Sequence, residues 1–360
     1  MKYLHIMPNE KFIVSYIEFI EKSFKINDHL FYIMSGVNYI NIPNKKRVKS
    51  FNKKIKNSFL KKLYMILSYL RIYINMIKSK KIILHSLLSS LTILFLFFNP
   101  WFLKKCNWVM WGGDLYSYRN RNINSFKKKI YYKMEDYVKK NIGQISYLAE
   151  GDYYLAKEFY DVKGVGKRAI YINPVDLSSL EKYKDKKNNK DILNIQVGNS
   201  ADPENNHLEI LDKLEKFKGE NIKIFVPLSY GNTENALKVK KYGEDKFGEK
   251  FIGMLEFFKP EKYAEYLSDI DILIFNHNRQ QGLGNIFALA YLNKKIYMRS
   301  DISSWDYLKN DLNLEIHDVV EINKFEDLKK NQIISNKEKV LKTVYSDEYI
   351  KKIWEENFNV

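Results

Sequence analysis

The sequence predicts an α/β protein with two doubly wound parallel sheets, one after the other along the chain. Short apolar runs of strand length alternate with segments in which apolar residues recur at helical spacing. The alternation occurs twice, before and after a polar stretch at 176–190 that is rich in Lys, Asp and Asn. The length of 360 residues also suits two domains of ordinary size. We therefore expect domains at 1–175 and 190–345, joined by this linker.

Strands and helices alternate in both predicted domains. In the first domain, strands are expected at 3–7, 30–34, 82–85, 108–111, 144–148 and 169–172, and helices at 12–24, 59–76, 87–98, 116–140 and 152–159. In the second domain, strands are expected at 192–197, 222–226, 251–253, 272–275 and 295–298, and helices at 206–217, 260–267 and 286–292. A capped helix at 346–358 ends the chain, and we expect it to pack back on the first domain.

A polar loop connects the fourth strand of the second domain to its helix. The unpaired N–H groups at the start of a helix carry about half an elementary charge, which attracts a phosphate. One forked cation, two amide side chains and two glycines occupy this loop: Arg279, Gln280, Gln281, Gly282 and Gly284. Glycines allow a ligand to approach the backbone closely. The loop matches neither GxGxxG nor a P-loop, and an ordinary polar turn is the alternative interpretation.

The loops at the carboxyl ends of the predicted strands are the places to expect a ligand, because open α/β sheets bind there. In the second domain these loops lie at 198–203, 227–231 and 276–284, and each is polar and contains glycine. In the first domain, His85 ends one predicted strand, and Asp114 follows another after Gly112 and Gly113. Two domains with polar edges of this kind suit a ligand held between them.

The net charge of +17 is concentrated in the first domain. No acidic residue occurs between Asp28 and Asp114, whereas fifteen Lys and Arg occur there. The densest part, 45–63, mixes cations with large apolar residues, which is typical of an interfacial helix on anionic lipid. A solvated basic face is the alternative interpretation. The cations that we expect to contact the membrane or an acceptor are Lys53, Lys54, Lys61 and Lys62.

Several further features bear on the location of the protein. The segment 82–103 is strongly apolar but contains His85, several Ser and Pro100. A spanning helix needs about 20 apolar residues, so we expect a buried strand followed by a buried or surface-inserting helix. The start of the sequence lacks the apolar core of a signal peptide, and the single Cys106 fits a reducing compartment. We therefore expect a cytoplasmic protein.

Four motifs carry a family resemblance: WGGDLY at 111–116, VGNSADPENNH at 197–207, VPLSYG at 226–231 and NRQQGLG at 278–284. Together they resemble glycosyltransferase family 56, the family of the TDP-Fuc4NAc:lipid II transferase of enterobacterial common antigen synthesis. The resemblance covers most of the chain and implies a GT-B fold, with two Rossmann-like domains that face each other across a cleft. It implies an acceptor site in the first domain and a nucleotide-sugar site in the second. It also implies a peripheral enzyme on the cytoplasmic face of the inner membrane, because the acceptor is a polyprenyl-diphosphate-linked sugar.

The resemblance implies transfer of a deoxyamino sugar from a TDP-sugar to that lipid-linked saccharide. The transfer needs a stabilised leaving diphosphate, a deprotonated acceptor hydroxyl and the two held in line. We predict that Arg279 and its loop bind the diphosphate. The residues that match the family's VGNS and SYG loops are predicted to reach phosphate, ribose or base, and these are Gly198, Asn199, Ser200 and Tyr230. Local helix capping is the alternative for Asn199 and Ser200.

For the base, Asp114 is the first choice because it follows a predicted strand and two glycines beside it leave room for a sugar. A helix N-cap is the alternative role for Asp114. His85 is the second choice, with a satisfied buried histidine as the alternative. His5 and Asp152 are weaker candidates, and packing or capping is the alternative for His207.

No metal and no cofactor are expected. Asp269 and Asp271 form a DxD triplet, but they precede the strand at 272–275, and their side chains would lie at the wrong edge of the sheet. The expected partners are a nucleotide-sugar donor, a polyprenyl-diphosphate-linked acceptor and an anionic membrane surface, with no nucleic acid. Two alternatives remain open: a transferase of the same fold for fucose or an N-acetylhexosamine, and a non-enzymatic basic module that binds membrane or nucleic acid.

Overall fold

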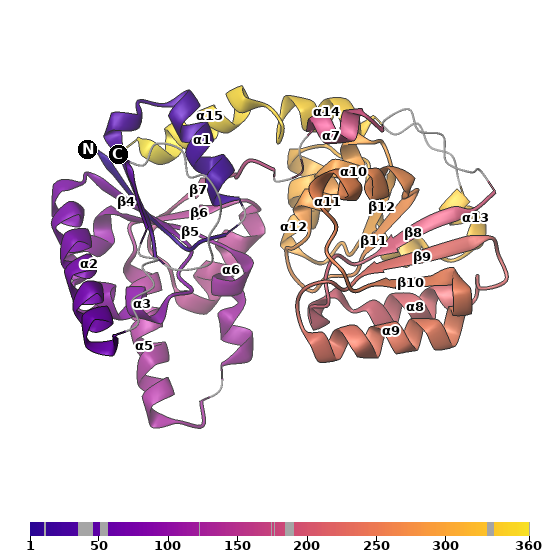
Figure 1. Cartoon of the computed structure of the whole chain (residues 1–360), viewed down its shortest axis with the longest axis horizontal. Helices are drawn as coiled ribbons and strands as arrows, with labels where there is room; N and C mark the ends of the chain where they lie inside the picture. Colours follow the sequence, from indigo (N-terminus) through magenta and orange to yellow (C-terminus); the bar gives the residue numbers. More distant parts are fainter. Residues whose placement is uncertain are drawn as a thin grey trace. The chain divides into compact units, whose positions relative to one another are not determined.

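The chain folds into two α/β units, each built around one parallel sheet (Figure 1). Unit 1 comprises Met1–Ile172 and Asp347–Val360, and unit 2 comprises Asn173–Ser346. The computed structural model describes residues 1–10, 12–34, 46–50, 57–121, 123–173, 175, 177–183, 191–329 and 335–359. The predicted fold class, two doubly wound parallel sheets, is confirmed.

The sheet of unit 1 has seven strands among the described residues, in the order β3-β2-β1-β4-β5-β6-β7. All of its pairings are parallel. The order reverses between β1 and β4, and this switch point is where open sheets of this type bind their ligands. The strands are β1 (Tyr3–Met7), β2 (His29–Ile33), β3 (Val48–Ser50), β4 (Lys81–His85), β5 (Cys106–Val109), β6 (Gln144–Tyr147) and β7 (Val165–Arg168).

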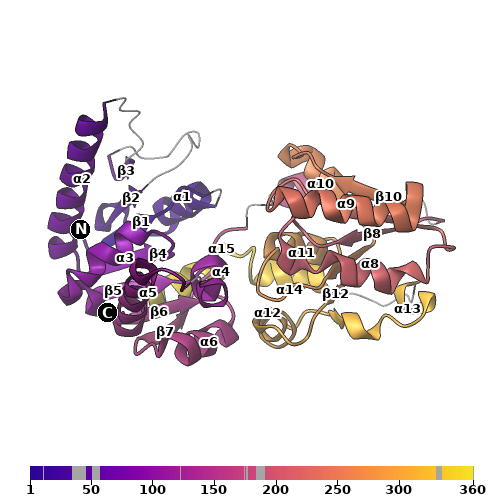
Figure 2. The ribbon, with the colours of Figure 1, turned by 90° about the horizontal axis from the view of Figure 1, so that it is seen from below.

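Helices cover both faces of this sheet (Figures 1 and 2). One face carries α1 (Ile13–Ser23) and α15 (Asp347–Phe358), and the other carries α2 (Ser58–Lys78), α3 (Ser90–Phe97), α5 (Phe126–Asn141) and α6 (Glu150–Tyr160). Successive side chains of a strand point to opposite faces. Leu4 and Ile6 of β1 therefore join the core under α2 and α3, whereas His5 contacts Tyr16 of α1 and Phe358 of α15.

Two predicted elements of unit 1 are wrong. The helix expected at 116–140 is divided into α4 (Gly112–Leu115), a 3-10 helix at Tyr116–Asn120 and α5. The intervening sequence is rich in Asn and Ser, whose side chains compete for backbone hydrogen bonds and disfavour a helix interior. The strand expected at 169–172 follows β7 instead of forming it, and its apolar residues are buried by α15: Trp354 Nε1 donates a hydrogen bond to the carbonyl of Ile170 at 2.8 Å.

The C-terminal helix α15 is anchored to unit 1 through a buried polar cluster. Asn357 is fully buried. Its Oδ1 accepts hydrogen bonds from Gln144 Nε2 at 2.9 Å and Ser146 Oγ at 2.5 Å. The Lys81 ammonium donates to the Asn357 carbonyl at 2.7 Å. These bonds tie the end of the chain to β4 and β6.

Unit 2 has six strands among the described residues, in the order β10-β9-β8-β11-β12-β13, with a switch point between β8 and β11. The strands are β8 (Leu193–Val197), β9 (Ile222–Pro227), β10 (Phe251–Met254), β11 (Ile272–Phe275), β12 (Lys295–Met298) and β13 (His317–Asp318). One face carries α8 (His207–Glu215) and α9 (Thr233–Phe247), and the other carries α10 (Pro260–Asp269) and α11 (Leu283–Tyr291) (Figure 1). Four short helices complete the unit: α7 (Leu177–Glu181), α12 (Ser303–Asp306), α13 (Phe325–Lys329) and α14 (Asn336–Lys342). The short α7 lies within the stretch predicted to be a linker.

The apolar segment 82–103 forms β4, α3 and a 3-10 helix at Pro100–Lys105. Ile93 and Leu96 of α3 are buried in the core of unit 1. Among the helices that the structure describes, none combines the length and apolar character that a bilayer crossing requires.

Candidate active site

Three loops at the carboxyl edge of the unit 2 sheet are joined by hydrogen bonds. The Asn199 amide, which follows β8, donates to the Tyr230 hydroxyl, which follows β9, at 2.7 Å. The backbone N–H of Asn278, after β11, donates to the carbonyl of Glu204 at 3.1 Å. The loops expected to bind a nucleotide sugar are therefore adjacent, and they flank the switch point between β8 and β11.

Asn205 is the centre of this loop cluster, and the sequence did not single it out. Its Oδ1 accepts from the backbone N–H of Asn199 at 2.9 Å and lies 2.9 Å from His277 Nε2. Its amide nitrogen donates to Ser200 Oγ at 3.2 Å and to the carbonyl of Asp202 at 3.0 Å. One buried side chain thus fixes the shape of the loop after β8 and its distance from β11.

Two glycines of the cluster occupy positions that no other residue fits. Gly198 has φ of +69°, and a Cβ there would lie 2.5 Å from His207 Nε2. Gly282 has φ of +68°, and a Cβ there would lie 2.7 Å from the Phe275 ring and 3.1 Å from Asn199 Cγ. Left-handed backbone and close approach both require glycine. Gly284 lies in the first turn of α11.

Several polar atoms of the cluster have no hydrogen-bond partner within the described part of the chain. They are buried, and they are Asn199 Oδ1, Gln280 Oε1 and Gln281 Nε2. A buried polar group without a partner costs about 1–3 kcal/mol, so a polar ligand at these atoms would remove a real penalty. They lie beside the start of α11, where Gly282 is the N-cap and no side chain caps the helix. A helix N-terminus of this kind binds anions.

Arg279 lies in this cluster with two carboxylate partners that the sequence did not predict. Its Nη2 is 2.6 Å from Asp202 Oδ2, and its Nε is 3.2 Å from Glu204 Oε2. The guanidinium therefore connects the loop after β11 to the loop after β8. Two carboxylates neutralise its charge locally, which weakens the expected role of Arg279 as a free cation for a diphosphate.

Ser200 and Tyr230 differ in how accessible their side chains are to a ligand. Ser200 Oγ already accepts bonds from Asn205 and from the backbone N–H of Asp202, at 3.2 and 3.3 Å, which favours the local capping role. Tyr230 is 43% exposed and stacks on Phe257, which is 73% exposed, with ring centroids 5.9 Å apart. The two rings form an exposed aromatic surface at the edge of the cluster.

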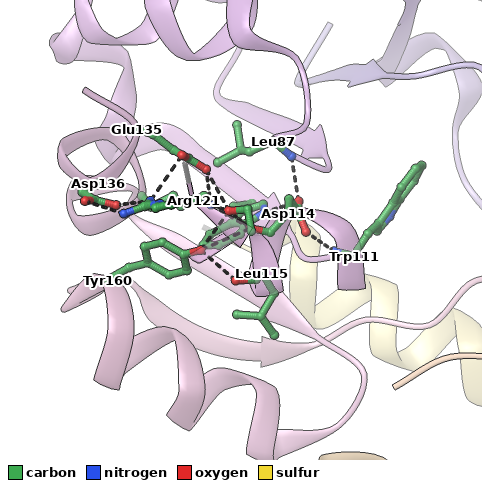
Figure 3. A network of polar contacts seen from close by, with 11 residues as sticks. Leu87, Trp111, Asp114, Leu115, Arg121, Glu135, Asp136 and Tyr160 are labelled. Carbon is green, nitrogen blue, oxygen red and sulfur yellow. Dashed lines mark hydrogen bonds and ion pairs between the residues drawn. The ribbon is translucent and has the colours of Figure 1, made fainter. Parts of the chain in front are cut away.

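In unit 1, Asp114 is buried and holds a turn (Figure 3). Its Oδ2 accepts from the backbone N–H of Leu87 and from Trp108 Nε1, both at 2.7 Å. Its Oδ1 accepts from the backbone N–H of Trp111 at 2.7 Å. Burial raises the pKa of Asp114, while the charge of Lys139 opposes that shift. All three donors are N–H groups and fit a carboxylate, so the geometry favours a structural role over a free base. Asp114 is not the predicted N-cap: it is the third residue of α4, and Trp111 is the N-cap.

A buried ionic network lies beside the same turn (Figure 3). Lys139 is fully buried and donates to the Asp114 carbonyl at 2.7 Å and to Glu135 Oε1 at 2.6 Å. Arg121 forms ion pairs with Glu135 at 3.2 Å and with Asp136 at 2.5 Å. The spacing of Glu135 and Lys139, four residues apart on a helix, was a signal for this pair in the sequence.

His85 belongs to a buried group of aromatic and histidine side chains. Its Nε2 lies 3.0 Å from His5 Nδ1, and its Nδ1 lies 2.5 Å from the Tyr171 hydroxyl. Burial lowers the pKa of His85 to about 3, so the ring is neutral at ordinary pH. Asp152, another candidate, accepts from the Tyr116 hydroxyl at 2.9 Å and is buried.

The remaining predicted residues fall elsewhere. Lys53 and Lys54 lie outside the described residues, and the side chains of Lys61 and Lys62 in α2 are likewise not described. His207 is buried, its ring nitrogens find no partner among the described residues, and burial lowers its pKa to about 4. The aspartates of the DxD triplet, Asp269 and Asp271, precede β11 at the amino edge of the sheet, and Asp271 accepts from the backbone N–H of Asn194 at 2.9 Å. Within the described ranges, no group of three His, Cys, Asp or Glu side chains is arranged to hold a metal ion.

Solved glycosyltransferase structures share this fold. The glycosyltransferase of Rickettsia africae ESF-5 is 16% identical, with a TM-score of 0.59 over 99% of this chain and 97% of its own. HepE of Anabaena, solved in complex with UDP and glucose, is 9% identical, with a TM-score of 0.64 over 100% of both chains. WaaG, a glycosyltransferase involved in lipopolysaccharide biosynthesis, is 10% identical, with a TM-score of 0.53 over 99% of this chain and 94% of its own. The fold is therefore of the GT-B type, as the resemblance implied.

The family is shown by the sequence itself. The pattern of glycosyl transferase group 56, described as 4-alpha-L-fucosyltransferase, matches residues 56–359. This span includes all four motifs that carried the resemblance, together with the loop cluster of unit 2 and the Asp114 turn of unit 1. A non-enzymatic binding module is therefore excluded. The chain is a glycosyltransferase, and it belongs to group 56.

Proposed function

We propose that this glycosyltransferase moves a deoxyamino sugar, similar to Fuc4NAc, from a TDP-sugar to a polyprenyl-diphosphate-linked saccharide. The reaction would take place on the cytoplasmic face of the inner membrane, without a metal. The single observation that carries the proposal is an exposed apolar and basic surface on unit 1, since a polyprenyl chain keeps its acceptor at a membrane.

That surface is formed by α2, α3, the 3-10 helix after α3, and α5. We define its apolar face by the exposed large side chains Phe59, Leu60, Leu63, Ile66, Leu67, Leu70, Ile74, Ile77, Leu91, Phe98, Trp101, Phe126 and Ile130. Those of α2 recur every three or four residues, so they line one side of the helix. The opposite side of α2, with Ile72 and Met76, is buried in the core of unit 1.

Aromatic contacts connect these neighbouring helices. The Phe95 ring of α3 lies 5.6 Å from Tyr69 of α2, and the Phe97 ring lies 5.5 Å from Tyr137 of α5. Tyr73 of α2 contacts the Phe102 ring of the 3-10 helix at 5.4 Å. Many large apolar side chains exposed on neighbouring helices favour an interaction site over ordinary surface.

Cations on the same helices favour an anionic membrane as the partner. Exposed Lys and Arg border the apolar face at Arg71, Lys78, Lys104, Lys127, Lys128, Lys129 and Lys133. A basic residue near anionic lipid contributes about 1 kcal/mol of binding. Buried apolar side chains add the hydrophobic part of the binding free energy.

The loop cluster of unit 2 is the proposed donor site. The start of α11 would bind the diphosphate, with the unpaired Gln281 Nε2 as a further donor. The unpaired oxygens Asn199 Oδ1 and Gln280 Oε1 only accept hydrogen bonds, so they would meet hydroxyl or N–H groups of the sugar or the base. Tyr230 and Phe257 would border the base. Amide donors placed before the reaction stabilise the charge that develops on a leaving diphosphate. HepE, which shares this fold, was solved in complex with UDP and glucose, and this supports a nucleotide sugar as the donor.

Vesicle binding tests the membrane part of this proposal. The purified chain should sediment with vesicles that contain phosphatidylglycerol and should remain in solution with phosphatidylcholine alone. The Ile66→Glu variant should lose most of this binding, because it places a carboxylate in the apolar face. The matched control is Leu237→Glu, which changes an aliphatic residue of similar exposure on α9 of unit 2, 58% against 65% for Ile66. Equal binding by both variants would contradict the proposal.

A second donor class also merits testing, because the family description names a fucosyltransferase. GDP-fucose and UDP-N-acetylhexosamines should therefore accompany the TDP-sugar in any assay. Transfer from one of these, with none from the TDP-sugar, would assign the same acceptor chemistry to a different donor.

A further inference from the structure

Three histidines and a tyrosine form an unbroken line of hydrogen bonds through unit 1. His29 Nδ1 lies 2.9 Å from His5 Nε2, and His5 Nδ1 lies 3.0 Å from His85 Nε2. His85 Nδ1 lies 2.5 Å from the Tyr171 hydroxyl, which also accepts from Trp111 Nε1 at 3.2 Å. Each of the two inner rings therefore uses both of its nitrogens.

This line runs diagonally across three inner strands, from the amino edge of the sheet to its carboxyl edge. His29 is the first residue of β2, His5 is central in β1, and His85 is the last residue of β4, in three adjacent parallel strands. The line passes through the switch point between β1 and β4. Tyr171 follows β7 and lies, with Trp111, at the carboxyl edge, where an α/β sheet of this type meets its ligand.

The line is sealed from solvent along its length. His5, His29 and His85 are all buried, with at most 1% of their surface exposed. Tyr16 of α1 and the Trp354 and Phe358 rings of α15 pack against them. Burial lowers the pKa of His29 to about 4, and it also lowers the pKa of His5 well below its usual range. All three rings are therefore neutral at ordinary pH.

Neutral rings give the line a direction. A neutral imidazole has one N–H donor and one bare nitrogen acceptor, so the tautomer of one ring sets the tautomer of the next. Trp111 donates to the Tyr171 oxygen, which leaves the Tyr171 proton free to point at His85 Nδ1. In that arrangement His85, His5 and His29 each carry their proton on Nε2. The Tyr16 hydroxyl, 3.5 Å from His5 Nδ1, then also faces an acceptor.

Among the described residues of this group, the Tyr171 end of the line is partly exposed, whereas His29 at the other end is only 1% exposed. Tyr171 and Trp111 are partly exposed. At the other end, His29 directly follows Asp28, whose carboxylate forms an ion pair with Lys2 at 3.1 Å and is 22% exposed. The charge of Asp28 raises the pKa of His29 against the larger effect of burial.

We infer that Tyr171 receives the proton of the acceptor hydroxyl during sugar transfer, and that His85, His5 and His29 relay a proton to the opposite edge of the sheet. The inference deepens the proposed function and rests on it. It assigns the catalytic contact to Tyr171 and makes the three histidines positioning residues that act through it. Asp114, with three N–H donors already bound, then serves to hold the turn beside Trp111.

The relay balances in atoms and charge. The acceptor oxygen forms a bond to the anomeric carbon, and the bond from that carbon to the diphosphate oxygen breaks, with its electron pair leaving on the diphosphate. The acceptor proton passes to the Tyr171 oxygen, and the Tyr171 proton passes to His85 Nδ1. His85 Nε2 then gives its proton to His5 Nδ1, and His5 Nε2 gives its proton to His29 Nδ1. His29 Nε2 gives one proton to water at the amino edge of the sheet, near the Asp28 carboxylate, which is 22% exposed.

Every ring is neutral before and after the transfer, which matters in a site where burial penalises charge. After the product leaves, the same steps in reverse restore the line, and Tyr171 releases its outward proton to water. A relay of this kind removes a proton from the acceptor without requiring a histidine that is basic at neutral pH.

Kinetics of the full-length enzyme with its lipid-linked acceptor test the relay. Tyr171→Phe keeps the ring and removes the hydroxyl, and kcat should fall about 100-fold, in the range for loss of one proton-transfer group. The KM for the donor should not change. The matched control is Tyr153→Phe, which also loses a phenol hydrogen bond, to the Gly164 carbonyl at 2.9 Å, but lies outside the line. Its kcat should equal that of the wild type.

A solvent isotope experiment separates relay from structural support. In mixtures of H₂O and D₂O, the wild-type rate should fall along a curve, because several protons move in one step. In His5→Asn, which keeps polar contacts but cannot exchange tautomers, the dependence should become linear. An unchanged curve in His5→Asn, or an unchanged kcat in Tyr171→Phe, would overturn the relay while leaving the proposed function intact.

The tautomers give a readout that does not need activity. Nitrogen NMR of the histidine-labelled protein should show His5, His29 and His85 neutral between pH 6 and 8 with protons on Nε2. In Tyr171→Phe, protons should appear on Nδ1, since His85 Nδ1 has lost its donor. Unchanged tautomers in that variant would overturn the relay even if no nucleotide-sugar substrate had been identified. A wild-type enzyme that transfers no sugar, with the tautomer shift present, would instead count against the proposed function.

Discussion

Arg279 is bound to Asp202 at 2.6 Å, across the gap between the loop after β11 and the loop after β8. The two residues are 77 positions apart in the sequence. The contact gives Arg279 a role in holding these two loops together. To bind a diphosphate, the Arg279 guanidinium would have to leave the Asp202 carboxylate. Changing each of the two residues in turn tests this.

Arg279→Ala should weaken nucleotide binding at least tenfold and lower the free energy of unfolding by about 1–2 kcal/mol, as expected for loss of charged hydrogen bonds. Asp202→Asn should also weaken binding, because the loop after β8 loses its connection to β11. Titration calorimetry with TDP and UDP measures both effects. Tighter binding by Asp202→Asn would show instead that Asp202 withholds a phosphate-binding cation.

Gly282→Ala should destabilise the protein and reduce donor binding. The new Cβ would lie 2.7 Å from the Phe275 ring, at a φ of +68°. Left-handed backbone alone costs a non-glycine residue about 1–2 kcal/mol, and the clash adds to it. Urea unfolding measures the change. Gly219→Ala is the control, because nothing lies within 4 Å of a Cβ at that position. Equal stability of the two variants would contradict this account.

Trp354→Ala should destabilise unit 1 by about 3–5 kcal/mol, the usual range for a fully buried tryptophan. The side chain is buried, and its Nε1 donates to the Ile170 carbonyl at 2.8 Å. Lys351→Ala, on the exposed side of α15, should change the stability little. Thermal unfolding compares the two. A loss in Trp354→Ala no larger than that of Lys351→Ala would mean that α15 is dispensable for unit 1.

The stability should fall as the pH drops from 6.5 to about 4. Burial lowers the pKa of His85 to about 3 and of His29 to about 4. Unfolded histidines bind protons near pH 6.5, so below that pH the unfolded state binds more protons than the folded state, and folding loses free energy. Each buried ring contributes up to about 1.4 kcal/mol per pH unit. Urea unfolding between pH 7 and 5, above the range of most carboxylates, should show this slope. A flat profile there would contradict buried neutral histidines.

Local sequence patterns predicted much of the fold, because short buried strands appear in the sequence as apolar runs bounded by polar residues. The strands at 272–275 and 295–298 have the predicted bounds. The predicted helix at 116–140 failed because its interruption depends on polar side chains that prefer turns. The predicted strand at 169–172 failed because burial under α15, a contact far away in sequence, gave it the apolar character of a strand.

The site could be predicted only at the level of loops. The sheet topology brings the ends of β8, β9 and β11 together, and the sequence order of strands was enough to expect it. The partners of Arg279 and the line from His29 to Tyr171 depend on contacts between residues 24 to 86 positions apart. No local pattern encodes these distances. The sequence singled out His85 alone, as a candidate base. The structure shows that His85 is bonded to His5 and Tyr171, and this suggests a role in a relay instead.

A mass-spectrometric screen of nucleotide sugars with a polyprenyl-diphosphate-linked acceptor tests the central claim most directly. The acceptor is presented in vesicles that contain phosphatidylglycerol. We predict that the acceptor gains the mass of one deoxyamino sugar from the TDP-sugar, and that a water-soluble acceptor without the polyprenyl chain gains much less. Efficient transfer to the soluble acceptor, or no transfer to the lipid-linked acceptor from any donor, would contradict this account.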